Sequence, residues 1–158
     1  MYNGYNVSAA VNYARTWAFQ RNNRYYNFDG IGGDCTSFIS QCLYAGCGVM
    51  NYTKDIGWYY NSANNRAAAW SSVEHLYKFL TTNKGKGPYG SVIGISQARI
   101  GDIIQLSFDG YKFAHSLLVT DIHNGKVFVT THSHDSLDRD IDTYSYKNLR
   151  VIRINGVR

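Results

Sequence analysis

The hydrophobic pattern of the chain changes its period from helical in the first half to alternating in the second. Apolar residues from Val7 to Ala18 recur at helical spacing, and the same spacing returns after Asp34 and after Ser72. The pattern predicts helices over residues 8–20, 34–46 and 71–83, with Ser8 as the first N-cap and Ser71 or Ser72 as the third.

The second half alternates as strands do. Strands are predicted over residues 100–108, 112–122, 126–134 and 149–154, and Asn124–Gly125 is a strong signal for a hairpin turn. Residues 84–91 contain the one proline and are predicted to form a surface loop. Helices followed by an antiparallel sheet predict an α+β fold with N-terminal helices packed on a C-terminal sheet, in a single domain over residues 1–158.

The composition of the chain limits the classes of molecule that it is expected to bind. Charged residues make up 17% of the chain and there are 14 tyrosines, a surface suited to carbohydrate or peptide. The net charge is +5, but no Lys/Arg cluster stands out, so nucleic-acid binding is not expected. No run approaches the length of a transmembrane helix, and the first residues lack signal-peptide features, so we expect neither membrane insertion nor a signal peptide in this chain. A monomer is expected.

Three cysteines lie in one short segment, and helix geometry separates them. Cys35 lies in the first turn of a predicted helix after a Gly-Gly-Asp loop, where free N–H groups and the helix dipole stabilise a thiolate. Cys42 lies on the apolar stripe of the same helix and is expected in the core. Cys47 follows the helix and is expected to be a spectator. Cys35 is therefore the candidate nucleophile.

A thiol nucleophile needs a base, usually a histidine oriented by a third polar group. A two-residue turn at Asn124–Gly125 places His115 opposite His134 and Leu117 opposite His132. The three histidines are therefore predicted on one face of the sheet. Apolar residues share that face, so it is expected to be the buried face on which the helices pack.

These residues resemble a known family. The segments "AAVNYARTWA", "FDGIGGDCTSFISQCLYAG", "WYY", "GDIIQL", "AHSLLVT" and "THSHD" resemble putative amidase domains, papain-like cysteine hydrolases related to the NlpC/P60 and CHAP peptidoglycan hydrolases. The chain departs from the pattern at Ser37, where the family pattern has Asn, and at Cys47–Gly48, where it has a pair of glycines. The resemblance implies a papain-like, NlpC/P60-type fold.

The resemblance also implies roles for individual residues. Cys35 would be the nucleophile and His115 the general base, either drawing the proton from the thiol or sharing a preformed thiolate–imidazolium pair. His132 is the first choice for the orienting residue, and the alternates are Asp135 and His134. Asp34 would cap the helix or bind substrate, and Trp58, Tyr59 and Tyr60 would line a groove or fold onto the core. No metal and no cofactor is expected.

The function implied is hydrolysis of an amide bond in bacterial peptidoglycan, as in a phage endolysin or a bacterial autolysin. The bond is that of an N-acetylmuramoyl-L-alanine amidase or of a stem-peptide endopeptidase, acting on the wall from outside or after release by another component. The parent protein could carry a wall-binding domain. Two alternatives stay open: a zinc amidase using His115, His132 and His134, and a non-catalytic wall-binding module.

Overall fold

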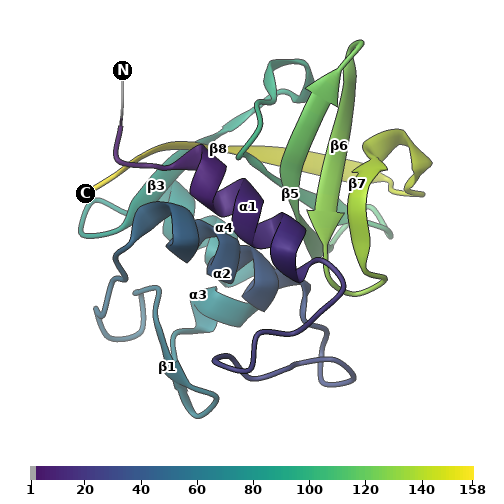
Figure 1. Ribbon diagram of the computed structural model, residues 1–158. Coiled ribbons are helices and arrows are strands. Elements are labelled where there is room, and N and C mark those ends of the chain that lie inside the picture. Colours follow the sequence, from purple (N-terminus) through teal and green to yellow (C-terminus); the bar gives the residue numbers. More distant parts are fainter. Residues whose placement is uncertain (1–2) are drawn as a thin grey trace.

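The structure is a computed structural model that describes residues 3–158. Its helices are α1 (Val7–Trp17), α2 (Cys35–Cys47), α3 (Ala68–Ser71) and α4 (Val73–Thr82). The main sheet has six strands in the order β3-β8-β4-β5-β6-β7, and every neighbouring pair is antiparallel. The prediction of an α+β fold with an antiparallel sheet is confirmed, and Figure 1 shows α1 and α2 lying across one face of that sheet.

The strands of the main sheet are spread over the second half of the chain. Their bounds are β3 (Pro88–Ile93), β4 (Ile103–Ser107), β5 (Phe113–His123), β6 (Lys126–Thr131), β7 (Ser136–Asp140) and β8 (Asn148–Val157). A small hairpin, β1 (Tyr60–Ser62) and β2 (Asn65–Arg66), and two short 3₁₀ turns, Ile95–Gln97 and Ile141–Thr143, complete the structure. Among residues 3–158, no helix has the length and apolar content that a bilayer span requires.

The predicted caps and ends of the helices agree only in part with those found. Helix α1 is capped by Asn6, whose side chain accepts the N–H of Ala9 at 3.0 Å, so the prediction of Ser8 is wrong by two residues. Helix α4 is capped by Ser72, as one of the two predictions had it. Helix α2 runs past the predicted end and is closed by Gly48 in the left-handed region, at φ 75°.

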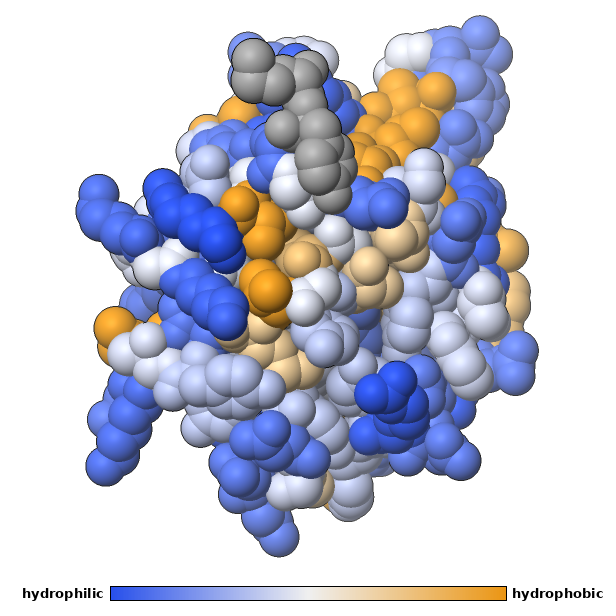
Figure 2. All heavy atoms as spheres, turned by 60° about the vertical axis from the view of Figure 1, so that its left-hand side comes forward, coloured by the Kyte–Doolittle hydropathy of each residue, from blue (hydrophilic) through white to orange (hydrophobic). Residues whose placement is uncertain are grey.

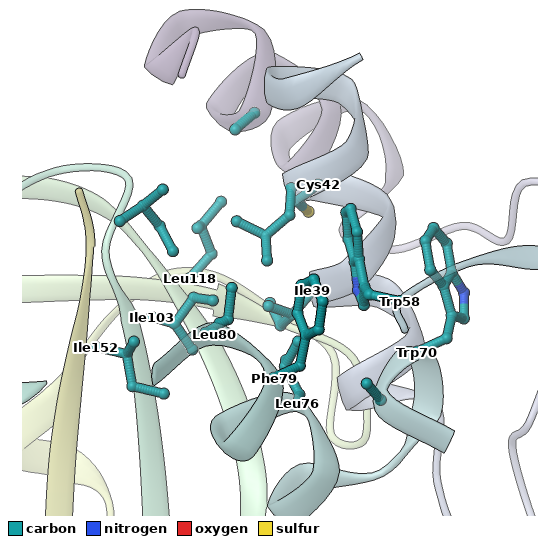
Figure 3. Close-up of a cluster of buried hydrophobic side chains, with 14 of the residues drawn as sticks. Ile39, Cys42, Trp58, Trp70, Leu76, Phe79, Leu80, Ile103, Leu118 and Ile152 are labelled. Atoms are coloured by element: carbon teal, nitrogen blue, oxygen red, sulfur yellow. The ribbon is translucent and has the colours of Figure 1, made fainter. Parts of the chain in front are cut away.

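Apolar side chains fill both faces of the sheet. On the helix face, residues of α2 and α4 pack on Ile103, Leu118 and Ile152 (Figure 3). On the opposite face, a second cluster forms around Ile104 and Leu117 and is covered by the chain after β7. Neighbouring residues of one strand therefore serve two separate clusters, as the pleat of a strand requires.

The hairpin of β1 and β2 and two strands of the main sheet, β3 and β7, are not predicted from the sequence. Residues 84–91 were expected to be a loop, but β3 pairs with β8 along the edge of the sheet. Strand β7 pairs with β6 and carries three charged residues in five, which conceals its alternation. Proline at the start of β3 and charges on β7 suit edge strands, since an edge strand needs protection against further pairing.

A β-bulge at Thr120 changes the predicted register of β5 and β6. The pairs from His123–Lys126 to Asp121–Phe128 match the predicted register, but Val119 then pairs with Val129, one residue out of it. Because side chains alternate, a shift of one residue exchanges the faces of the strand. The prediction that His115 lies opposite His134 and shares a face with His132 is therefore wrong.

The surface is mostly polar on the side that Figure 2 brings forward. Most of its coloured atoms are pale or deep blue, and hydrophobic atoms occur in separate groups. This is the appearance expected of a chain with 14 tyrosines and few charges.

Candidate active site

Cys35 opens helix α2 after a loop that only glycine tolerates well. Gly32 and Gly33 have φ of 84° and 95°, a region disfavoured for residues with a Cβ. The Cys35 side chain is buried, and the backbone N–H groups of Ser116 and Thr36 point to its sulfur. Thr36 also bonds the Ser116 hydroxyl at 3.0 Å, which fixes the start of α2 against β5.

Cys35 and His115 line one pocket of about 500 Å³. Ala114 and His115 of the lining come from the start of β5, and Gly32 comes from the loop before α2. The other lining residues are Phe108, Ser133, His134, Arg139, Thr143, Tyr144 and Ser145. Nucleophile and base candidates thus meet in the same cavity, although His115 does not lie on the face that the helices cover.

The electrostatics of the pair favour the uncharged forms. Burial raises the pKa of the Cys35 thiol, and the two N–H donors to the sulfur offset this only in part. Burial, together with the charges of His134 and Arg139, lowers the pKa of His115 to about 4. At neutral pH the pair is therefore a thiol beside a neutral imidazole. The stabilisation expected from the helix N-terminus does not overcome burial.

His132 lies outside the pocket. Its ring stacks on Phe38 with centroids 3.8 Å apart, and its Nδ1 is 2.7 Å from an Asp34 carboxylate oxygen. Its Nε2 donates to the Trp17 carbonyl at 2.8 Å, so neither nitrogen is left for His115. Because His132 points away from His115, the three histidines of the zinc alternative do not converge. Among residues 3–158 no group of three or more metal-ligating side chains forms.

Asp34 is buried with His132 and does not cap α2 through its side chain. It occupies the N-cap position of α2 without a side-chain capping bond, so that expectation is wrong. Its carboxylate accepts the N–H of Phe28 at 2.9 Å, and Arg21 lies 3.7 Å away. The carboxylate is absent from the residues that line the pocket. The geometry places Asp34 in the support of the loop before Cys35.

The turn after β6 places the two alternate orienting residues, Asp135 and His134, on opposite sides of the chain. Asp135 makes a two-point ion pair with Arg21, at 2.9 and 3.0 Å, and does not reach the pocket. Ser133 and His134 both have φ of 64°, which turns the chain sharply, and His134 lines the pocket beside His115. Of the three predicted orienting residues, His134 is therefore the one that lines the same pocket as Cys35 and His115.

The three aromatic residues predicted to touch substrate lie elsewhere. Trp58 is fully buried in the core (Figure 3). Its indole N–H donates to the Ser40 hydroxyl at 3.0 Å. Tyr59 and Tyr60 are half-buried against the same cluster. None of the three lines the pocket of Cys35, so the interpretation as a loop folded onto the core fits the structure.

The other two cysteines lie outside the pocket. Cys42 is fully buried among the helix-face residues, as predicted (Figure 3). Burial raises the pKa of Cys47 to about 12, and its side chain also packs against the core.

Several pocket residues gave no signal in the sequence. Arg139 and Tyr144 come from segments whose strand and turn were not predicted. Arg139 comes near His115 because β7 pairs with β6, and that pairing could not be predicted from the sequence.

Comparisons with known proteins agree with the resemblance at the family level. A family model described as "Putative amidase domain" matches residues 4–154. The chain is 29% identical over 136 residues to "Uncharacterized protein YhbB" of Bacillus subtilis (strain 168), covering 84% of this chain and 42% of that protein. It is 27% identical over 143 residues to "Uncharacterized protein YjcM" of the same organism, covering 85% and 32%. The chain thus spans less than half of these relatives, and no solved structure matches it.

Proposed function

The chain belongs to the family of putative amidase domains, and from that membership we propose that it hydrolyses an amide bond of bacterial peptidoglycan with Cys35 as nucleophile and His115 as base. The observation that carries the proposal is the shared pocket of the two residues. A buried thiol at a helix start, with backbone donors on its sulfur and a neutral imidazole beside it, has the parts that nucleophilic catalysis needs.

The reaction starts from the uncharged pair. His115 takes the proton of Cys35 as the sulfur attacks the amide carbonyl carbon, and the oxyanion forms near the backbone N–H groups at the start of α2. His115 then gives this proton to the leaving amine as the carbon–nitrogen bond breaks. Water, deprotonated by His115, hydrolyses the thioester and regenerates the thiol.

For the residue that orients His115 we propose His134 in place of His132. His134 lines the pocket with His115, and a neutral His134 would accept the second ring N–H of His115. His132 has both nitrogens engaged by Asp34 and Trp17. It then supports the loop before Cys35 instead of taking part in proton transfer.

Beyond the family membership, a fold type, a substrate bond and a kind of parent protein can be proposed. We propose a papain-like, NlpC/P60-type arrangement, in which the nucleophile begins a helix and the base lies on a following strand. The substrate bond is the N-acetylmuramoyl-L-alanine amide or an amide within the stem peptide. Because the chain covers under half of its relatives, we propose that it acts as the catalytic domain of a wall hydrolase, an endolysin or an autolysin, beside a wall-binding domain.

The test is digestion of purified peptidoglycan with mass spectrometry of the new amino termini. Cys35→Ala removes the nucleophile and should abolish release of products while leaving the circular dichroism spectrum unchanged. Cys47→Ala, a thiol outside the pocket, is the matched control and should keep activity. Hydrolysis by Cys35→Ala would overturn the cysteine mechanism. Binding of the wall by the wild-type chain without any turnover would make it a wall-binding module instead.

A further inference from the structure

Arg139 brings a positive charge into the pocket without a negative partner. It lies on β7 and lines the pocket with His115, and no Asp or Glu is among the lining residues. In residues 3–158, the carboxylates within ion-pair distance of a cation belong to other partners, and none is paired with Arg139. The cationic side of the pocket is therefore open to an anion from outside the chain.

The guanidinium group is held in one orientation. Its Nε donates to the Thr143 hydroxyl at 2.8 Å and one terminal nitrogen donates to the Thr143 carbonyl at 3.1 Å. Its plane lies over the Tyr144 ring, with 3.8 Å from the central carbon to the ring centroid. These contacts leave further N–H donors free while they fix the group, which reduces the entropy lost when a ligand binds.

The positive charge of Arg139 makes His115 a weaker base unless an anion is bound beside Arg139. Its charge is one of the causes that lower the pKa of His115, the others being burial and the charge of His134. A positive charge also opposes the imidazolium that forms when Cys35 attacks. A substrate anion paired with Arg139 would cancel this effect at the moment of reaction.

We propose that Arg139 binds a carboxylate of the substrate beside the scissile amide, so that the enzyme selects stem peptides whose carboxylates are free over those in which they are amidated. Arginine pairs with carboxylates through two parallel bonds, and such bonds are stronger than those between neutral groups. This inference rests on the proposed function, because it names the substrate class of the same pocket.

The test uses soluble muropeptides in two forms, one with free carboxylates and one converted to carboxamides by carbodiimide and ammonium. Binding is measured by calorimetry on the Cys35→Ala protein, which cannot turn substrate over. Since a hydrogen bond to a charged group contributes about 1.5–3 kcal/mol, conversion should weaken binding about tenfold or more. In Cys35→Ala/Arg139→Gln the two forms should bind equally. Cys35→Ala/Arg24→Gln, which loses an exposed arginine away from the pocket, should still discriminate.

Activity gives a second readout. In the wild-type background, Arg139→Gln should shift the acid limb of kcat/KM to higher pH, because a positive charge near His115 is removed. Equal binding of the two muropeptides by Cys35→Ala, binding of neither, or discrimination that persists without Arg139, would overturn the inference. Discriminating binding without hydrolysis by the wild-type chain would instead overturn the proposed function and leave the carboxylate site standing.

Discussion

At the scale of residues, the pocket holds the proposed catalytic pair, Cys35 and His115, whose pKa shifts both favour the neutral form. Burial acts on Cys35 and His115 in opposite directions, raising the pKa of the thiol and lowering that of the imidazole. Both shifts remove charge, since a buried site disfavours ions. Of the two resting states considered from the sequence, the structure favours the neutral pair over the thiolate–imidazolium pair.

The first prediction concerns the pH dependence of hydrolysis. With a pKa of about 4, His115 is protonated below that pH and cannot accept the thiol proton. We expect kcat/KM to rise as the pH rises through about 4 and then to level off near neutrality. Initial rates on soluble muropeptides between pH 3 and 8 measure this, and an acid limb near the ordinary histidine pKa of about 6.5 would contradict it.

The second prediction concerns the buried pair of His132 and Asp34. Replacing His132 by Ala leaves a carboxylate that is almost fully buried beside Arg21, at 3.7 Å, without its 2.7 Å partner. Removing one member of a buried pair costs about 3–5 kcal/mol, so the free energy of unfolding in urea should fall by that amount. Asp135→Asn, which weakens a partly exposed ion pair, is the control and should cost about 1 kcal/mol or less. Equal losses for the two variants would count against the support role of His132.

At the scale of elements, the sequence predicts the helices, strands and turns that depend on residues close together in the chain. The hydrophobic pattern and the turn residues of the sequence predict the helices α1, α2 and α4, the strands β4, β5 and β8, and the Asn124–Gly125 turn. The bulge at Thr120 could not be predicted, because it depends on contacts such as the 2.8 Å hydroxyl pair of Thr120 and Thr130. This one bulge exchanges the faces of β5, so the partner predicted for His115 is misplaced, although His115 and Cys35 line one pocket.

The third prediction concerns the pairing of β3 with β8. A Cβ at Gly90 would collide with the backbone carbonyl of Arg153, whereas one at Gly94 would meet only the Ser96 hydroxyl, at 4.0 Å. Gly90→Ala should therefore force the strands apart and lower the melting temperature by several degrees, as a loss of 1 kcal/mol or more does. Gly94→Ala should change it little. Thermal unfolding followed by circular dichroism compares the two, and equal melting temperatures would argue against this pairing.

At the scale of the whole molecule, one sheet joins two apolar clusters. The helix-face cluster contains Ile103 and Leu118, and the opposite cluster contains Ile104 and Leu117. Consecutive residues of β4 and β5 thus belong to different clusters. Neither cluster can lose its sheet residues without disturbing the strands that the other needs.

The fourth prediction follows from that sharing. Trp58 and Trp70 lie in the helix-face cluster, so tryptophan fluorescence reports mainly that side. Far-ultraviolet circular dichroism reports helices and sheet together. We expect both signals to change at the same urea concentration, as in one cooperative transition. Two separated midpoints would show that the clusters unfold independently.

The turn of residues 132–135 has a consequence for how such a domain can diversify. Its first and last residues, His132 and Asp135, are tied to Asp34 and Arg21, while His134 between them lines the pocket. The two residues that secure the turn therefore flank Ser133 and His134, which both line the pocket. Because the anchors hold the backbone of the turn, a library of variants at Ser133, the other pocket-lining residue of the turn, can alter substrate preference while the proposed orienting residue His134 is kept.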